Sequence, residues 1–355
     1  MLQTATRTNR RTLIALVLLF QLLVGVVLVE VALVTIFAHP SSRYPPALLE
    51  FLRWEYFYRR SVVQLDEGRA RYDPELLYTL RPGRFTFANI EYSTPYAVNS
   101  LGVRDDEAAL AHPEIVVAGD SYAMGWGVQQ DEAFPQVIRG KTGRRVLNAA
   151  VSSYGTVREM RLLDRVDMSQ ATTLVIQYCS NDFDENDQFE EHGNRHVPSR
   201  EQEWLQAIAS QQRTAHYRPF RMLYDSAVWI KRGIEGHRWG GFEFFPPPAE
   251  RAAERFLNAV IYAPHQDLTR LRILVTDPEP DPRFIRALDR LHRDPKYPPY
   301  IRTMQIVDVS ALMTPDVRYV LDDHPNARGQ RLIAEALIAA MRPGCCIEDS
   351  PPGQR

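Results

Sequence analysis

The sequence predicts an α/β fold, a three-layer α/β/α sandwich around a five-stranded, mainly parallel sheet, preceded by one transmembrane helix. Short apolar strands alternate with helical segments through the middle of the 355-residue chain, which is typical of parallel strands joined by crossover helices. These strands are apolar almost throughout, as expected for a sheet that is covered on both faces. A mostly apolar segment, residues 13–37, stands near the N-terminus and predicts the membrane helix.

Composition excludes several classes of function. The net charge of −2 gives no basic face, so we expect no nucleic-acid partner. Only three cysteines are present, Cys179, Cys345 and Cys346, which is too few for a disulfide framework or a cysteine-based zinc site. The adjacent pair Cys345-Cys346 could close a strained vicinal disulfide, and we favour two free or externally paired thiols.

The apolar segment Leu13–Phe37 would extend about 37 Å as a helix, enough to cross a membrane with some tilt. No small-residue cleavage motif follows it, so we expect an uncleaved anchor. Arg7, Arg10 and Arg11 stand directly before it and place residues 1–12 in the cytoplasm. The remainder would then be extracytoplasmic, which in a bacterium means a single-pass inner-membrane protein with its main domain in the periplasm.

Glu30 lies inside this segment, and an acid within a membrane is by default a functional candidate. We favour a plainer interpretation, in which its side chain is protonated, reaches the interface or contacts a partner helix. Residues 38–104 follow as a juxtamembrane segment with a short amphipathic helix over 47–60 and extended pieces at 85–87 and 90–92. They predict a small β-rich segment that packs on the main domain and is not a separate domain.

The main domain is predicted over residues 105–342, where strands and helices alternate. Expected strands are 115–118, 146–151, 173–178, 271–276 and 303–309; expected helices are 131–143 with Asp131 as N-cap, 157–166, 250–261, 282–292 and 327–341. In the last helix we expect Leu332, Ala336, Leu337 and Ala340 to face inward. Residues 183–265 interrupt the alternation with helical pieces at 201–211 and 220–232, and predict a lid or substrate wall. Residues 343–355 are predicted to be a flexible tail.

Two segments carry the chemistry of a serine hydrolase. Ser121 follows the strand 115–118 in the turn Gly119-Asp120-Ser121, at the sheet edge where reactive groups collect. His324 stands in the loop Asp322-Asp323-His324 before the last helix, so a base and a carboxylate that orients it lie on one segment. We expect Asp120 to hold the turn by hydrogen bonds rather than to react.

In combination these segments resemble the SGNH (GDSL-type) hydrolase superfamily from about Tyr72 to Met341. The resemblance rests on four blocks in order: Gly119-Asp120-Ser121, Asn148 with the turn at Ser153, Ser180-Asn181-Asp182, and Asp322-Asp323-His324. The approach segment Asn99–Arg104 is also similar to the one in membrane-anchored members. The resemblance implies a flavodoxin-like sheet and no cofactor or metal. It makes Ser121 the nucleophile, His324 the base and Asp322 its orienter, with an oxyanion hole formed by the backbone N–H of Ser121, the backbone N–H of Ser153 and the side-chain amide of Asn181.

Three departures from the family pattern bear on the site. Ser153 stands where the family usually has glycine, which keeps the N–H but adds a side chain that narrows the pocket. Cys179 replaces a glycine of the third block, and we expect a packed core thiol there. The spacing Asp-x-His replaces the common Asp-x-x-His because position 321 is leucine, which leaves Asp323 as the alternative orienter.

The sequence therefore predicts an extracytoplasmic serine esterase that hydrolyses acyl esters, acetyl above all, of a glycan or another small ester substrate. Two alternatives stay open: an O-acyltransferase supplied by a membrane acyl-donor partner, and a catalytically silent glycan-binding module. Competing motifs are weaker. No Gly-x-Ser-x-Gly elbow is present, Gly125-Trp126-Gly127 lacks the third glycine of a dinucleotide loop, and His192 with His196 is poorly placed for zinc.

Overall fold

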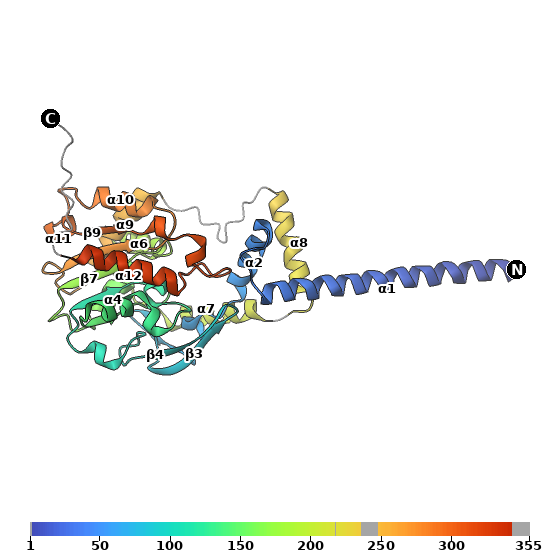
Figure 1. The fold of residues 1–355 in the computed structure, drawn as a ribbon, viewed down its shortest axis with the longest axis horizontal. Coiled ribbons are helices and arrows are strands. Elements are labelled where there is room, and N and C mark those ends of the chain that lie inside the picture. Colours follow the sequence, from blue (N-terminus) through green and yellow to red (C-terminus); the bar gives the residue numbers. More distant parts are fainter. Residues whose placement is uncertain (1, 217, 236–247, 343–355) are drawn as a thin grey trace, which may run out of the picture. The chain divides into compact units, whose positions relative to one another are not determined.

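The computed structural model describes residues 2–216, 218–235 and 248–342 (Figure 1). They form two compact units. The first contains the residues up to 60 and those from 213 to 235, and the second contains 61–212 and 248–342. The predicted tail, with Cys345 and Cys346, lies outside the described residues.

Three helices make up the first unit: α1 (Leu2–Ala38), α2 (Pro46–Arg59) and α8 (Arg221–Ile234). Among the described residues, one helix segment is long and apolar enough to cross a membrane, Arg10–Ala38, and it contains the predicted span 13–37. Glu30 is buried within this segment and accepts hydrogen bonds from the backbone N–H groups of Met222 (3.2 Å) and Leu223 (2.9 Å). The partner of this acid is thus a helix of the same chain.

The second unit is built on a five-stranded parallel sheet of order β6-β5-β7-β8-β9. Its strands are β5 (Ile115–Ala118), β6 (Val146–Asn148), β7 (Thr173–Gln177), β8 (Arg272–Asp277) and β9 (Gln305–Asp308). All residues of β5 and β7 are buried, as the continuous apolar runs predicted. This architecture confirms the α/β fold class and the flavodoxin-like strand order.

Helices cover both faces of this sheet. The steps from β5 to β6 and from β6 to β7 run in opposite directions across the sheet, so right-handed crossovers place the intervening helices on opposite faces. α4 (Phe134–Thr142) packs with the closing helix α12 (Ala327–Met341), and α5 (Thr156–Leu163) packs with α6 (Asp182–Glu191) and α9 (Ala249–Tyr262). One layer thus contains α4 and α12, and the other contains α5, α6 and α9 together with α10 (Arg283–Leu291), which packs beside α9. Figure 1 shows the two layers above and below the sheet. The remaining helices are α3 (Ser121–Met124), α7 (Glu201–Ala215) and α11 (Pro299–Arg302).

Several predicted elements need correction. Asp131 is not a helix N-cap: it lies in a 3₁₀ turn, Gln130–Glu132, where Gln129 and Glu132 cap each other reciprocally, and α4 begins only at Phe134. Pro135 in the first turn of α4 suits that later start because its missing N–H needs no partner there.

The predicted strand 146–151 is shorter, since β6 ends at Asn148. In α12 the bounds are as predicted, but its buried face is centred on Ile333, Ala334 and Leu337. Of the residues predicted to face inward, Leu337 is buried, and Leu332, Ala336 and Ala340 are half-buried and pack against the edge of the core. The apolar face of this alanine-rich helix is broad, so its centre is ambiguous from sequence.

Two antiparallel hairpins precede the sheet, β1 (Ala70–Asp73) with β2 (Leu77–Leu80) and β3 (Gly83–Asn89) with β4 (Tyr92–Val98). The β-rich character of this segment was predicted, whereas the first hairpin was not. Ile90 and Glu91, expected to be extended, form the tip of the second hairpin. Both hairpins belong to the same unit as the sheet.

Candidate active site

Ser121 lies at the carboxyl end of β5, where the chain turns into α3. Asp120 is the N-cap of α3, and its side chain accepts a hydrogen bond from the backbone N–H of Tyr122 (3.0 Å). Ser121 is buried, and its Oγ lies 3.4 Å from Asp120 Oδ2. Asp120 therefore holds the turn, as predicted. Its burial raises the pKa of the Asp120 carboxyl, although the N–H of Tyr122 and the nearby imidazole of His324 act against this rise.

Gly119 and Gln177 fix the shape of this turn. A Cβ at Gly119 would come within 2.8 Å of both Ala123 Cβ and Gln177 Oε1, so only glycine allows the strand end to pass so close to α3. Gln177 Oε1 accepts hydrogen bonds from the N–H groups of Asp120 (3.2 Å) and Ala123 (2.9 Å). A buried side chain of β7 thereby supplies the hydrogen-bond acceptor that backbone N–H groups at the start of α3 lack within the helix. Gln177 had no predicted role because a glutamine in a strand carries no recognisable motif.

The other end of the turn is held by Arg104, the last residue of the approach segment 99–104. Its buried guanidinium donates hydrogen bonds to the backbone carbonyls of Met124, Gly125 and Val128. It also lies 3.7 Å over the ring of Tyr96. Since α3 is only four residues long, these contacts replace the hydrogen bonds that a longer helix would supply.

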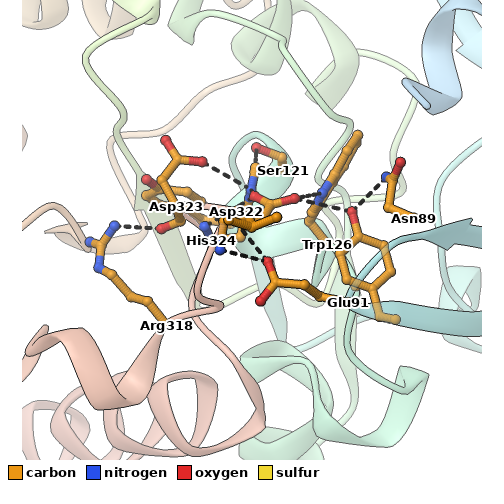
Figure 2. Close-up of polar contacts among 12 residues, drawn as sticks. Asn89, Glu91, Ser121, Trp126, Arg318, Asp322, Asp323 and His324 are labelled. Carbon is orange, nitrogen blue, oxygen red and sulfur yellow. Dashed lines mark hydrogen bonds and ion pairs between the residues drawn. The ribbon is translucent and has the colours of Figure 1, made fainter. Parts of the chain in front are cut away.

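His324 lies within hydrogen-bond distance of Ser121. Its Nε2 accepts from Ser121 Oγ at 2.8 Å, and its Nδ1 donates to Asp322 Oδ1. Both His324 and Asp322 are buried. The imidazole ring stacks on Trp126, with centroids 5.0 Å apart and planes 19° apart, and meets Tyr122 edge-on. The structure thus joins Ser121 to His324, 203 positions later in the sequence, and to Asp322 in one hydrogen-bonded chain, shown in Figure 2.

The geometry favours Asp322 over Asp323 as the orienter. Asp322 Oδ2 also accepts hydrogen bonds from Trp126 Nε1 (3.0 Å) and Tyr92 Oη (3.1 Å), so its carboxylate is fixed on both oxygens. The Asp323 side chain is 64% exposed and its Oδ1 lies 3.3 Å from His324 Nδ1. An exposed carboxylate at that distance is screened by water and orients the ring poorly.

These carboxylates set the protonation of His324. Burial alone would lower the pKa of the imidazole, but the charges and hydrogen bonds of Asp322 and Asp323 outweigh it and raise the pKa to about 9. The same two carboxylates would stabilise an imidazolium if His324 took the proton of Ser121. The raised pKa also means that the neutral form, which is the one able to act as a base, becomes dominant only at alkaline pH.

The loop that carries Asp322 is held by the tip of the β3–β4 hairpin. Glu91 accepts hydrogen bonds from three successive backbone N–H groups, those of Val320 (2.6 Å), Leu321 (2.8 Å) and Asp322 (2.9 Å). Burial raises the pKa of Glu91, while these donors act to lower it. Figure 2 shows Glu91 below the Asp322–His324 loop, and Asn89, whose side-chain amide donates a hydrogen bond to Tyr92 Oη (2.8 Å). Neither Glu91 nor Tyr92 could be singled out from sequence, since nothing local links them to a loop about 230 residues away.

Ser153 lies in the turn after β6 and has a left-handed backbone, with φ of 58°. A side chain is strained in this conformation, which glycine adopts more easily. Two contacts hold the residue. Its Oγ accepts from Gln64 Nε2 (2.8 Å), and its carbonyl accepts from Arg158 Nη2 (2.7 Å). The side chain predicted to narrow the pocket is thus hydrogen-bonded to Gln64.

The turn of Ser153 depends on the first hairpin as well. Tyr78 of β2 donates its hydroxyl to the carbonyl of Ser152 (2.7 Å), and Tyr154 donates its hydroxyl to the carbonyl of Tyr78. Burial raises the pKa of the Tyr78 hydroxyl to about 12, so it remains a donor. Each of the two hairpins therefore braces one loop of the site.

Asn181 and Cys179 follow β7 at the same sheet edge. Asn181 is exposed and directly precedes α6 as its N-cap residue. Its assignment as an oxyanion donor stays a prediction. Cys179 is a buried free thiol, and burial raises its pKa well above the usual range, so it is poorly suited to act as a nucleophile. This agrees with the packed core thiol predicted from sequence.

Among the described residues, one group could hold a metal ion by geometry, Asp322, Asp323 and His324, whose ligand atoms lie within 4.8 Å of one another. Both ring nitrogens of His324 already have partners, Asp322 and Ser121. A metal would have to displace one of them. The three residues therefore fit the hydrogen-bonded chain from Ser121 to Asp322 better than a metal site.

No protein-family model and no curated protein matches the chain. Solved structures similar to it include three proteins whose names refer to lipolytic activity. One is a protein from Desulfitobacterium hafniense DCB-2 assigned to the lipolytic G-D-S-L family (10% identity, 64% of this chain and 98% of that one, TM-score 0.34). Another is the lipase Lip_vut3 from a goat rumen metagenome (16%, 64% and 96%, TM-score 0.33). The third is phospholipase A1 from Streptomyces albidoflavus NA297 (12%, 64% and 99%, TM-score 0.31). The chemistry of the site is inferred from its own residues.

Proposed function

We propose that this chain is a serine esterase of the SGNH type, which removes acyl groups through an acyl-enzyme. The observation that carries this proposal is the continuous hydrogen-bonded chain from Ser121 Oγ through His324 to Asp322. A serine hydroxyl is a weak nucleophile until a base takes its proton, and here the base lies 2.8 Å away and is held by a buried carboxylate.

In the proposed mechanism, Ser121 Oγ attacks the ester carbonyl while His324 Nε2 takes its proton. Asp322 keeps the Nδ1 proton in place and stabilises the imidazolium. The negative charge on the carbonyl oxygen would be met by the backbone N–H groups of Ser121 and Ser153 and by the Asn181 amide. The alcohol leaves with the proton from His324, and water, activated by the same base, then releases the acid and restores Ser121.

For the substrate, we propose an acyl ester of a glycan or a related polyhydroxyl compound, with acetyl as the acyl group, processed outside the cytoplasm. The support is the small Ser121 turn, which is buried, together with the candidate membrane helix and the arginines before it in the sequence. A buried nucleophile suits a short acyl chain better than a long one, because each added methylene needs a cavity.

The test is hydrolysis of a small acetyl ester and of an acetylated oligosaccharide by the full chain in detergent or nanodiscs, with a sugar acceptor present. The proposal expects free acetate from both, not acetylated acceptor, and a loss of at least about 10³-fold in Ser121→Ala. Undiminished activity in Ser121→Ala would contradict the assignment. Acetyl transfer to the sugar in preference to water would replace the esterase by an O-acyltransferase.

A further inference from the structure

Helix α8 carries an apolar stripe that faces outward. Tyr224, Ile230 and Ile234 are 70%, 54% and 82% exposed, and Phe220, which directly precedes the helix, is 46% exposed. Their spacings of three, four or six residues place them, with Ala227, on one side of the helix. Large exposed apolar residues scattered singly need no explanation, but a continuous stripe of this kind marks a surface that something covers.

The opposite side of α8 is already occupied by its own unit. Met222 is buried, and Trp229 meets Phe51 of α2 edge-on at 5.9 Å. Arg221 pairs with Asp225 at 3.0 Å on the same helix. The side of α8 that packs against α2 is thus a different one from the apolar stripe, which stays exposed among the described residues.

The start of α8 is tied to the candidate membrane span. The carboxylate of Glu30 in α1 accepts hydrogen bonds from the backbone N–H groups of Met222 and Leu223. These two groups belong to the first turn of α8, where N–H groups have no acceptor within the helix. A carboxylate in an apolar segment is costly without partners, and a helix N-terminus supplies both donors and positive potential. This contact fixes the level along α1 at which α8 begins.

With Arg11 in one headgroup layer, that level would correspond to the far edge of a bilayer. From Arg11 to Glu30 the helix rises about 28 Å, close to the thickness of a hydrocarbon core, about 30 Å. If Arg11 remains in one headgroup layer, Glu30 reaches the boundary on the other side. The whole segment Arg10–Ala38 is about 43 Å long and continues beyond this boundary. Figure 1 shows α8 running across the direction of α1 rather than along it.

We propose that α8 is a second membrane contact, an interfacial helix whose apolar stripe (Phe220, Tyr224, Ala227, Ile230 and Ile234) enters the lipid surface from which α1 emerges. A helix that crosses a spanning helix at the bilayer boundary lies in the membrane plane. Aromatic residues along the helix and the exposed Lys231 and Arg232 in its last turn are typical of such helices. With two contacts, the α1–α2–α8 unit would have a fixed orientation on the membrane rather than free rotation about one helix.

The experiment uses the full chain in lipid nanodiscs, with Cys345 and Cys346 replaced by serine and one new cysteine carrying a polarity-sensitive fluorophore. Ile230→Cys and Ile234→Cys test the stripe. Leu28→Cys on α1 is the lipid reference, and Gln202→Cys, an exposed position on α7, is the aqueous reference. We expect labels at 230 and 234 to be quenched by nitroxides on the lipid acyl chains as at 28, and to be several-fold less accessible to iodide than at 202.

Labels at 230 and 234 that behave like the label at 202 would overturn the proposal. Labels shielded from both quenchers would overturn it as well, because they would indicate a protein partner in place of lipid. The role of Glu30 is tested by Glu30→Leu against Glu30→Gln, since glutamine keeps an acceptor oxygen. We expect lipid quenching at 234 to fall at least twofold in Glu30→Leu and to persist in Glu30→Gln. Unchanged quenching in Glu30→Leu would exclude the tether. These results do not depend on esterase activity.

Discussion

The two halves of the candidate site are constructed differently. The nucleophile turn combines local and distant support: Asp120 caps α3 and Gly125 ends it in a left-handed conformation, while Gln177 accepts the N–H of Ala123 from 54 positions away. The base loop is stabilised from a distance, because Asp322 is bound by Trp126, 196 positions away, and its backbone by Glu91, 231 positions away. The nucleophile turn therefore has local caps of its own, whereas the carboxylate and the backbone of Asp322 depend on contacts with Trp126 and with the β3–β4 hairpin.

This difference predicts where substitutions act. Changes near Ser121 should remove the reacting atoms or distort a short rigid turn. Changes in the hairpin should leave the nucleophile intact and loosen the base. The variants below test this contrast, from the largest expected effect to the smallest.

Asp322→Asn removes the charge that holds and stabilises His324. We expect kcat to fall about 10⁴-fold, as when the carboxylate of a serine-hydrolase triad is neutralised. In the parent protein, kcat/KM should rise with pH through the ionisation of His324 near 9, since only neutral imidazole accepts the proton. In Asp322→Asn the inflection should move down toward the ordinary pKa of histidine, because the imidazolium loses its stabilising partner.

Asp323→Asn is the matched control for that experiment. Its side chain is exposed, so we expect kcat to change less than about threefold and the inflection to shift only slightly. A larger loss in Asp323→Asn than in Asp322→Asn would reverse the assignment of the orienter. Both variants are compared by pH–rate profiles on a small acetyl ester.

Asn181→Ala removes one predicted oxyanion donor. Loss of such a donor costs about 2.7–4 kcal/mol of transition-state stabilisation, or about 10²–10³-fold in kcat, with little change in KM. Asn181→Asp is the sharper companion variant, because a carboxylate of the same shape would repel the developing charge and should be worse than alanine. If both variants hydrolyse the ester at the parent rate, Asn181 lies outside the oxyanion hole.

Glu91→Ala leaves three backbone N–H groups of the base loop without their acceptor. We expect kcat to fall about 10–100-fold while KM changes little, the range found when supporting side chains of a site are removed. Glu91→Gln keeps an acceptor oxygen and should recover most of the rate. Near-parent activity in Glu91→Ala, with thermal stability unchanged, would show that the hairpin does not position the base.

The smallest expected effect is that of metal removal. Because both nitrogens of His324 are used in the hydrogen-bonded chain from Ser121 to Asp322, incubation with EDTA should leave the hydrolysis rate unchanged. Loss of activity with EDTA and recovery on addition of a divalent ion would instead assign Asp322, Asp323 and His324 to a metal site.

Continuous apolar runs predicted the central strands well, as in Ile115–Ala118. The edge strand β9 begins with Gln305 and ends with Asp308 and is only partly buried. The parallel pairing followed from the alternation of strands and helices, and the flavodoxin-like order was what the family resemblance implied. Boundaries that depend on capping were less predictable: Asp131 is a good N-cap residue by type, yet the reciprocal pair Gln129 and Glu132 starts a 3₁₀ turn instead.

Within the candidate site, the proposed nucleophile and base could be predicted from sequence, and the residues that support them could not. Ser121 and His324 stand at strand and helix ends that the pattern identifies, whereas Gln177, Glu91 and Trp126 act through contacts across the fold. The strained backbone of Ser153 could not be predicted either, because a positive φ in a non-glycine residue has no signature in a single sequence. The prediction that 183–265 form a lid or substrate wall stays a prediction; α6 and α9 from this range pack against α5.

The measurement that tests the central claim most directly is covalent trapping of the nucleophile. The full chain is treated with a serine-directed fluorophosphonate at pH 9, digested and analysed by mass spectrometry, beside Ser121→Ala. The account predicts a single adduct on the peptide that contains Ser121, absent from Ser121→Ala and formed at least about 10²-fold more slowly in His324→Ala. An adduct on another serine, or none on Ser121 in the folded protein, would contradict it.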